Sequence, residues 1–345
     1  MPNSSRGRSL ITRRITLTAM AVGLARAPAE AQAVLTFPGK TVEVIGLRRW
    51  TIPMVQDSLA KYAPGITLDS HACAQALRYK LGFADAAVMS YQTPGDSLET
   101  VLVIVVEPQD SARVQYRPAP LDSARPRAAW RPLLRVIREK PPAFQTALWQ
   151  YRAWELDPHV ALPPWAARDS TEIRAVWRFL AGQRRSAHLE TAIRVLRTDS
   201  NVYDRIAAAA ILANFTDQDR ALHALVGALL ESDGPVKGIA SIVLESFSQE
   251  RPRPVDWRPV AAELHAILNG TDLFALSATM RLLVATGVHS DLAPSLLRGG
   301  GEMVLSFLTA QHPDPRLSAH ALLVALRGTD LGFDINPWRE WIRSL

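Results

Sequence analysis

The sequence has a single cysteine, Cys73, among its 345 residues. One thiol cannot form a disulfide within the chain, so we expect packing to stabilise the fold. Cys73 lies in the segment 71–77, which has a helical pattern of small and apolar side chains. We therefore expect it to be a buried apolar side chain, with a reactive thiol as the alternative.

The sequence also lacks the short motifs that mark common catalytic sites. It contains no HExxH, no GxSxG nucleophile elbow and no Walker phosphate loop. Glu263 and His265 fall on one expected helix, but residues two apart point to different sides and make a poor ligand pair. The histidines are scattered, at positions 71, 159, 188, 223, 265, 289, 312 and 320. We predict that the protein is not an enzyme and has no catalytic residues, no metal site and no cofactor.

Three consecutive glycines, 299–301, precede an expected helix that begins at Met303. Backbone N–H groups at a helix start offer an anion site. A flexible connection between helices is the commoner reason for three glycines, and we expect a connection here.

A long apolar run is missing near the N-terminus. The apolar segment 15–24 has about ten residues, too few to cross a hydrocarbon layer of ~30 Å at 1.5 Å per residue. A basic segment, 6–14, precedes it, and a small-x-small pattern, 31–33, follows. This order is typical of a signal peptide, so we predict cleavage of residues 1–33 and export to the periplasm or cell envelope. An uncleaved anchor and twin-arginine export through Arg13-Arg14 are the alternatives.

Net charge is small once residues 1–33 are set aside. The whole chain has 39 basic and 33 acidic residues and a net charge of +6. The first 33 residues hold five Arg and one Glu, which leaves 34 basic and 32 acidic residues, a net charge of +2. No basic stripe remains, so we predict no binding to nucleic acid.

Residues 37–108 combine strand and helix patterns. Thr51 followed by Pro53 predicts a helix start, because Thr caps helices and Pro is tolerated in the first turn. Asp69 is expected to cap a second helix. The run 101–106 (VLVIVV) is apolar on both faces, which predicts a central, buried strand. The expected order is strand, helix, helix, strand and strand, at 41–45, 51–63, 69–81, 86–91 and 101–106.

Each of these two helices is expected to bury one face. For the first helix we expect this face to hold Met54, Val55, Leu59 and Tyr62. For the second we expect Ala72, Ala76, Leu77 and Tyr79 inside. A turn is expected at 93–96, between the last two strands.

Particular residues accompany this order, in the segments 44–46, 77–83 and 105–108 (VIG, LRYKLGF and VVEP). With them, residues 37–108 resemble a POTRA domain, the polypeptide-transport-associated module of outer-membrane assembly factors and related division proteins. The resemblance implies a module that binds proteins by adding a strand to a sheet edge, here within 84–106. An unrelated small α+β domain is the alternative. The family's usual C-terminal β-barrel is not matched, because no run of alternating strands follows.

Ten prolines fall between Pro108 and Pro164. The first part is too rich in proline for a core element, so we predict a Pro-rich linker at 109–141. Helical patterns appear at 130–138 and 142–154. Tryptophans crowd this region, at positions 130, 149, 154, 165 and 177. They indicate either a partner-binding surface or a cap that buries its rings on the first helical repeat, and we favour the cap.

A signal repeats in the second half of the chain. Asp199, Asp233, Asp272 and Asp314 each stand before an Ala- and Leu-rich helical pattern, at spacings of 34, 39 and 42 residues. A period of this size is typical of a helical solenoid. Asp169 is expected to begin a further helix with a capping box.

Helical patterns continue in pairs to the last residue. We expect helices at 169–181 and 187–196, 206–215 and 220–230, 236–247 and 257–268, 273–284, 317–326 and 337–345. The partner of 273–284 is either 292–297 or 303–308.

Two of these blocks, 233–244 and 314–326, carry a resemblance to the short HEAT-like repeats of bacterial proteins. Asp233 with Val236-Lys237, and Asp314 with Arg316-Leu317, are the residues that match most plainly. The resemblance covers about 169–345 and implies an α-α superhelix with an extended face that binds other proteins. We predict a mainly α fold, with a HEAT-like solenoid over 142–345 preceded by a small α+β (β-α-α-β-β) POTRA-like domain.

These features favour an exported, non-enzymatic scaffold or adaptor. Its predicted partners are other envelope or periplasmic proteins, bound through the solenoid face and the POTRA-like domain. One alternative is an enzyme or enzyme subunit with a site in the Trp-rich segment 130–177. A second is a periplasmic accessory of outer-membrane protein assembly. Peripheral membrane association and the oligomeric state stay open at this point.

Overall fold

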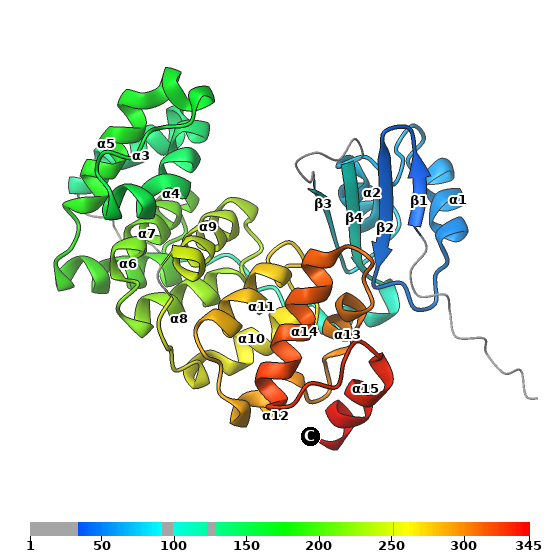
Figure 1. Ribbon diagram of the computed structural model, residues 1–345. Helices are drawn as coiled ribbons and strands as arrows, with labels where there is room; N and C mark the ends of the chain where they lie inside the picture. The colour runs from blue at the N-terminus through cyan, green and yellow to red at the C-terminus, as the bar shows by residue number, and fades with distance from the viewer. Residues whose placement is uncertain (1–33, 92–98, 123–127, 251) are drawn as a thin grey trace, which may run out of the picture.

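The computed structural model describes residues 34–91, 99–122, 128–250 and 252–345. A small sheet with two helices lies beside a larger helical part, so the prediction of a mainly α fold is confirmed (Figure 1). The predicted signal peptide at 1–33 and the turn expected at 93–96 lie outside the described residues.

The sheet has the strand order β1-β2-β4-β3. Strand β4 lies between β2, with which it is parallel, and β3, with which it is antiparallel. The bounds are β1 Val34–Phe37, β2 Lys40–Ile45, β3 Asp85–Tyr91 and β4 Glu99–Val106. The predicted element order is wrong in one respect, because it lacks β1. This short, half-exposed strand pairs antiparallel with β2 at one edge of the sheet.

Two helices cover one face of the sheet, α1 (Ile52–Tyr62) and α2 (Ala72–Tyr79). Thr51 caps α1 as predicted, and its hydroxyl accepts the N–H of Met54 at 3.4 Å. The prediction that Asp69 caps α2 is wrong. Its carboxylate accepts a hydrogen bond from the nearby hydroxyl of Thr67, and α2 begins three residues after Asp69.

The two helices bury narrower stripes than predicted. Val55 and Leu59 on α1, and Ala76 and Leu77 on α2, are buried against the sheet. Met54, Tyr62, Ala72 and Tyr79 are exposed, contrary to the prediction. Two helices side by side on one sheet leave their flanks in solvent, and there Lys61 and Arg78 lie over the rings of Tyr62 and Tyr79.

Strand β4 is buried on both faces, as predicted for a central strand. Its odd-numbered residues, Val101, Val103 and Val105, pack with α1 and α2. Its even-numbered residues, Leu102, Ile104 and Val106, belong to the core of the helical part. Successive side chains of a strand point to opposite faces, so one strand contributes to two cores. The sheet and the helical part are therefore joined through a continuous apolar interior.

The helical part begins at α3. Its helices are α3 Arg131–Glu139, α4 Pro141–Leu156, α5 Ser170–Ala181, α6 Ser186–Thr198, α7 Val202–Leu212, α8 Asp219–Ala228, α9 Gly234–Glu250, α10 Ala261–Leu268, α11 Leu276–Ala285, α12 Ala293–Leu297, α13 Glu302–Leu308, α14 Pro313–Arg327 and α15 Ile335–Ser344. Short 3-10 turns include η1 Pro108–Arg113, η3 Pro164–Asp169, η4 Ala213–Phe215 and η5 Arg258–Val260. Each predicted helix after residue 130 is matched by one of these elements. The capping role predicted for Asp169 is wrong, because its side chain makes no cap hydrogen bond.

The helices after α5 pack in two rows. In one row α7 packs on α9, α9 on α11, and α11 on α14. In the other row α6 packs on α8, α8 on α10, and α10 on α12. Each repeated Asp of the sequence therefore stands at the start of a helix in the first of these rows.

An ionic contact links each helix of the first row to the next helix in that row. Arg205 on α7 pairs with Asp233, which precedes α9. Lys237 on α9 lies 3.4 Å from the carboxylate of Asp272, which precedes α11. Arg281 on α11 lies 3.0 Å from the carboxylate of Asp314, in the first turn of α14. Three of the four repeated aspartates thus bind a cation from the preceding helix.

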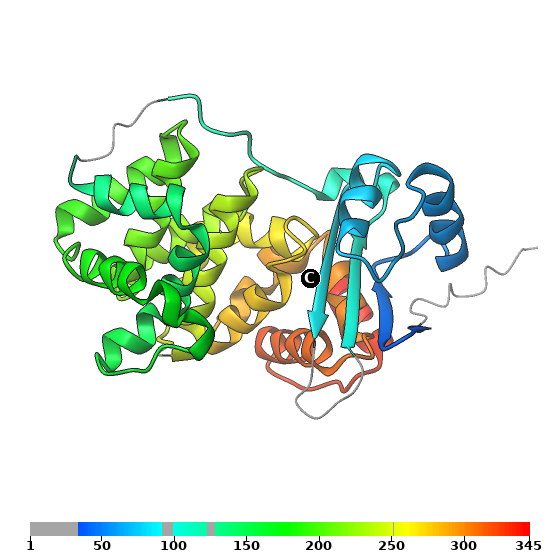
Figure 2. The same ribbon diagram turned by 90° about the horizontal axis from the view of Figure 1, so that it is seen from above.

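The predicted linker at 109–141 is too long, because α3 already begins at Arg131 and α4 at Pro141. The extended stretch before α3 runs along the outside of the molecule (Figure 2). The N–H of Arg117 donates to the carbonyl of Leu230 at 2.6 Å. The N–H of Ser200 donates to the carbonyl of Asp122 at 2.6 Å. This stretch, 114–122, is therefore fixed to the helical part by backbone hydrogen bonds.

Burial divides the crowded tryptophans into two groups. Trp130 and Trp177 are buried, and the indole N–H of Trp177 donates to the carbonyl of Ala147 at 2.8 Å. Trp154 is half-buried and stacks on Trp177 with ring centroids 5.4 Å apart. Trp149 and Trp165 remain 45% and 71% exposed. Part of the cluster seals the first helices, and part faces outward.

Candidate functional site

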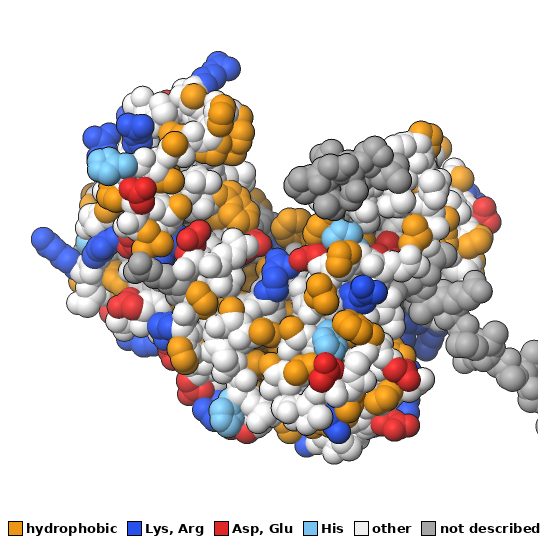
Figure 3. All heavy atoms as spheres, in the orientation of Figure 1, with side chains coloured by type: hydrophobic (Ala, Val, Ile, Leu, Met, Phe, Trp, Pro, Cys, Tyr) orange, Lys and Arg blue, Asp and Glu red, His pale blue; other side chains and the backbone are white. Residues whose placement is uncertain are grey.

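A hollow separates the lobe formed by α3, α4 and α5 from the sheet (Figure 3). Hydrophobic side chains gather on the side of this lobe that faces the hollow. The large exposed apolar side chains of the lobe are Trp149 and Leu156 on α4 and Trp165 on η3. Exposed aromatic rings with few rotatable bonds are favourable anchors for a protein partner.

A polar network joins the sheet to the helical part. Arg281 donates to Asp314 at 3.0 Å and to Glu245 at 3.3 Å. The phenol of Tyr91, on β3, donates to Asp314 at 3.3 Å, and its ring lies on that of His312 with centroids 4.3 Å apart. Burial, and then the charge of Asp314, raise the pKa of Tyr91, so the phenol remains a donor. Strand β3 is therefore bound to α14 directly, and to α11 and α9 through Arg281.

A second, more buried network lies at the other end of β3. The phenol of Tyr116 donates to Asp85 at 2.7 Å and accepts the N–H of Asp272 at 3.1 Å. Lys237 Nζ lies 3.2 Å from the same phenol oxygen and 3.4 Å from the Asp272 carboxylate. Burial raises the pKa of Asp272 to about 6, although Lys237 opposes the shift. These contacts join β3, the stretch 114–122, α9 and the loop before α11.

The exposed strand edge expected within 84–106 falls on β3, because β4 occupies the middle of the sheet. Asp85 to Val88 are buried, and Met89 to Tyr91 are partly or fully exposed. Only the second half of this edge is therefore accessible in the described residues.

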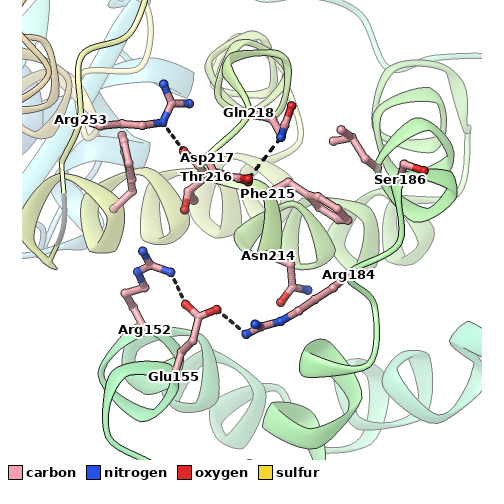
Figure 4. A pocket seen from close by; sticks show the side chains of 12 residues that line it. Arg152, Glu155, Arg184, Ser186, Asn214, Phe215, Thr216, Asp217, Gln218 and Arg253 are labelled. Carbon is pink, nitrogen blue, oxygen red and sulfur yellow. Dashed lines mark hydrogen bonds and ion pairs between the residues drawn. The ribbon is translucent and has the colours of Figure 1, made fainter.

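A cavity of about 550 Å³ lies within the helical part, and none of its lining residues comes from the sheet (Figure 4). Its walls come from the ends of α4 and α9, the loop between α5 and α6, and the loop that precedes α8. The charged lining residues are Arg152, Arg184, Arg253, Glu155 and Asp217. The apolar ones are Leu189, Phe215 and Phe247, and the neutral polar ones are Ser186, Asn214, Thr216 and Gln218.

Ion pairs hold the arginines of this cavity. Glu155 lies between Arg152 and Arg184 and binds each of them through a different carboxylate oxygen (Figure 4). Arg253, on the opposite wall, donates to Asp219 at 2.6 Å. The guanidinium groups are therefore fixed in position and retain further N–H donors.

The scattered histidines are placed in separate contacts. His223 contacts the carbonyl of Asp256 at 2.7 Å, and His265 contacts that of Leu296 at 3.0 Å. Glu263 pairs with Arg117 at 2.7 Å and does not join His265. In the part of the chain that the structure describes, no three His, Cys, Asp or Glu side chains gather as a metal site would require.

Cys73 and the turn formed by the three glycines at 299–301 lie in closely packed parts of the fold. Cys73 is buried, and burial, with the charge of Asp69, raises the pKa of its thiol to about 12. A Cβ on Gly300 would lie 3.0 Å from the side chain of Asn269, so this turn packs closely against α10. Gly299 and Gly301 have φ of +69° and +79°, which suits glycine. The turn therefore needs glycine for its backbone.

Comparison of the chain with family models, with curated proteins and with solved structures gave no match. Across the described residues, no helix is both long and apolar enough to cross a membrane.

Sequence reasoning did not identify the arginine-lined cavity. Arg152, Arg184 and Arg253 lie on three separate segments and share no motif. The local signal is the presence of basic residues in short inter-helix loops, at 184–185 and at 253. Such loops are ordinarily solvated, so that signal alone does not indicate a site.

Proposed function

We propose that this protein is an exported, non-enzymatic scaffold that binds another envelope or periplasmic protein in the hollow between the α3–α5 lobe and the sheet. The observation that carries the proposal is the combination of that hollow with exposed aromatic side chains on the facing lobe. Large rigid rings at the centre of an interface supply most of the binding energy in many complexes.

We also propose that the chain consists of a HEAT-like solenoid and a POTRA-like domain. The two rows of packed helices, with a cation-to-Asp contact at each step, support a HEAT-like solenoid. The succession β2, α1, α2, β3 and β4 supports a POTRA-like domain. In this proposal the sheet is one wall of the binding hollow and not an independent module, since its second face is buried on the helical part.

Export is supported by the basic, apolar and small-residue order of residues 1–33. N-terminal sequencing of the protein recovered from the cell envelope tests it. A mature terminus near residue 34 supports cleavage. An intact N-terminus in a cytoplasmic fraction would remove export from the proposal.

The proposal is tested by substitution of the exposed aromatic side chains of the α3–α5 lobe. Tagged wild-type protein, a Trp149→Ala/Trp165→Ala variant and a Tyr62→Ala control are crosslinked in cells and purified from the envelope. Tyr62 matches them in exposure and lies on α1, on the opposite face of the sheet from the helical part. A partner should be retained by the wild type and the control and be reduced at least about tenfold by the double variant.

Circular dichroism of the three proteins checks that the fold is unchanged. If the same partner is retained equally by all three, the hollow is not the binding surface. If purified protein instead turns over a substrate, the non-enzymatic proposal is wrong.

A further inference from the structure

Positive charge is concentrated in the segment 128–198, which forms α3 to α6. This segment holds 12 basic and 6 acidic residues, a net charge of +6. The rest of residues 34–345 holds 22 basic and 26 acidic residues, a net charge of −4. The small net charge of the chain therefore conceals one strongly basic part.

Three arginines form a stripe along α3, which we call the α3 stripe. Arg131, Arg135 and Arg138 are all exposed. They are four and three residues apart, so they share one face of the helix. The guanidinium group of Arg138 lies over the ring of Tyr203, 5.0 Å from its centroid. The expectation that no basic stripe remains after residue 33 is therefore wrong.

Ion pairs do not neutralise the α3 stripe. Where the structure describes the chain, the ion pairs of the segment 128–198 are Lys140–Asp169, Arg152–Glu155, Arg184–Glu155 and Glu190–Arg220. None of these pairs includes an arginine of the stripe.

Neighbouring carboxylates leave a surplus of positive charge. Glu139, on α3, is exposed and belongs to none of these pairs. Arg138 acts to lower the pKa of Asp204, on α7, but burial and the charge of Asp199 raise it. Counted to the end of α7, residues 128–212 hold 13 basic and 8 acidic residues, still a net charge of +5.

The positions of these arginines are unfavourable for the isolated fold. Arg131 is the first residue of α3, where the helix dipole is positive and disfavours a cation. Arg135 is a neighbour of both Arg131 and Arg138 on the helix surface, and like charges at such spacings repel. An anionic surface bound to the stripe would remove these costs.

The kind of basic residue indicates phosphate as the anion. Of the 12 basic residues in the segment, 11 are arginine and one is lysine. A guanidinium group forms two parallel hydrogen bonds with a phosphate, which an ammonium group does not. The Lys and Arg side chains of this part lie mostly on its outer side, away from the hydrophobic side chains that face the hollow (Figure 3). An outer helix face can approach a broad surface of phosphate groups, such as a bilayer.

We propose that the α3 stripe binds the surface of a bilayer that contains anionic phospholipids. The three arginines donate hydrogen bonds to lipid phosphate groups, and the net charge of the segment attracts the protein to the negative surface. The choice of lipid over nucleic acid rests on the export that is part of the proposed function. The stripe shares no residue with the exposed tryptophans of the hollow.

Vesicle sedimentation tests the proposal. Residues 34–345, which contain every described helix and strand, are mixed with vesicles of phosphatidylcholine alone or with about 30% phosphatidylglycerol. Without residues 1–33, the basic and apolar segments found there do not bind the lipid themselves. The anionic vesicles should bind at least about tenfold more tightly, and added salt should weaken that binding by screening.

Variants locate the binding to the α3 stripe. Arg131→Gln/Arg135→Gln should weaken binding to the anionic vesicles about 25-fold, since each arginine near such a surface contributes about fivefold. Arg49→Gln/Arg343→Gln is the matched control, because both residues are exposed, lie outside the segment and remove the same charge. The control should change binding by less than about threefold. Arg138 is left intact because it packs on an aromatic ring.

Thermal unfolding should show no loss of stability in Arg131→Gln/Arg135→Gln, because the substitutions remove repelling charges. The proposal is overturned if vesicles with and without phosphatidylglycerol bind equally, or if the control variant weakens binding as much as the stripe variant. It is also overturned if a single-stranded oligonucleotide or polyglutamate binds as tightly, per negative charge, as the anionic vesicles. Loss of export from the proposed function would leave vesicle binding measurable, so the two failures are distinguishable.

Discussion

Glu43, in the middle of strand β2, accepts a hydrogen bond from the backbone N–H of His312 at 3.0 Å, 269 residues further along the chain. The same carboxylate accepts the N–H of Gln311 at 2.5 Å, and its side chain is almost fully buried. His312 is the N-cap residue of α14, a position at which N–H groups have no partner inside the helix. A strand side chain thus caps a helix of the first row.

Substitution of Glu43 should destabilise the protein. We expect Glu43→Ala to lower the free energy of unfolding by about 2 to 4 kcal/mol, because two partly buried N–H groups lose a charged acceptor. Glu43→Gln keeps one acceptor oxygen and should cost less. Glu190→Ala, at an exposed ion pair with Arg220, is the control and should cost under about 1 kcal/mol. Urea unfolding measures all three, and equal costs for Glu43→Ala and Glu190→Ala would refute the capping role.

Arg205 tests the ionic contacts between successive helices. Its side chain is fully buried and bound to Glu231 and Asp233. We expect Arg205→Met to cost about 3 to 5 kcal/mol, because Glu231 then keeps a buried charge without a partner. Arg220→Met, at the exposed pair with Glu190, should cost about 1 kcal/mol or less. Thermal unfolding compares the two, and a small loss for Arg205→Met would show that the contact contributes little.

Gly46 tests the junction between sheet and helices. Its φ is +96°, and a Cβ there would lie 2.2 Å from the carbonyl oxygen of Val105. Gly46→Ala should therefore cost at least about 3 kcal/mol, since backbone strain and displacement of β4 add together. Gly39 has a similar φ of +73° with open space around it, so Gly39→Ala should show only the strain, about 1 to 2 kcal/mol. Equal losses in a denaturant titration would mean that the contact with β4 is readily relieved.

Asp272 makes stability depend on pH. Its pKa is about 6 in the folded protein, above its ordinary value of 3.8, because burial disfavours the charged form. The folded chain therefore binds a proton more readily than the unfolded chain, and this group's contribution to stability is lost as pH rises from about 4 to 6. Asp272→Asn suits the left-handed backbone at this residue, where φ is 57°.

Urea unfolding at intervals between pH 4 and 7 measures the effect. The slope of unfolding free energy against pH should be more negative for the wild type than for Asp272→Asn, by up to about 1.4 kcal/mol per pH unit. An unchanged slope in the variant would assign the pH dependence to other groups.

Elements with a strong local pattern could be predicted from the sequence. The apolar run of β4 identified a strand buried on both sides, and the spacing of Asp199, Asp233, Asp272 and Asp314 identified successive helices of one row. These patterns are visible because each depends on residues close together in the chain.

Features that depend on distant residues could not be predicted. Strand β1 has only four half-exposed residues, and its hydrogen bonds come from pairing with β2. The role of Asp69 was mistaken because a hydroxyl two residues away competes for its carboxylate. The cavity arginines come together only when α4, α6 and α9 pack. No periodic pattern along the chain predicts that these arginines lie close together.

Because β4 belongs to two cores, its two faces are covered at different stages of folding. The sheet has an apolar face, with Leu102, Ile104 and Val106, that belongs to the core of the helical part, and Gly270 lies against Val106. Contacts at such long separation form slowly, because a large loop must close first. During synthesis one apolar face of the N-terminal sheet therefore stays exposed until the helical part has been made. We expect a chaperone to bind that face in the interval.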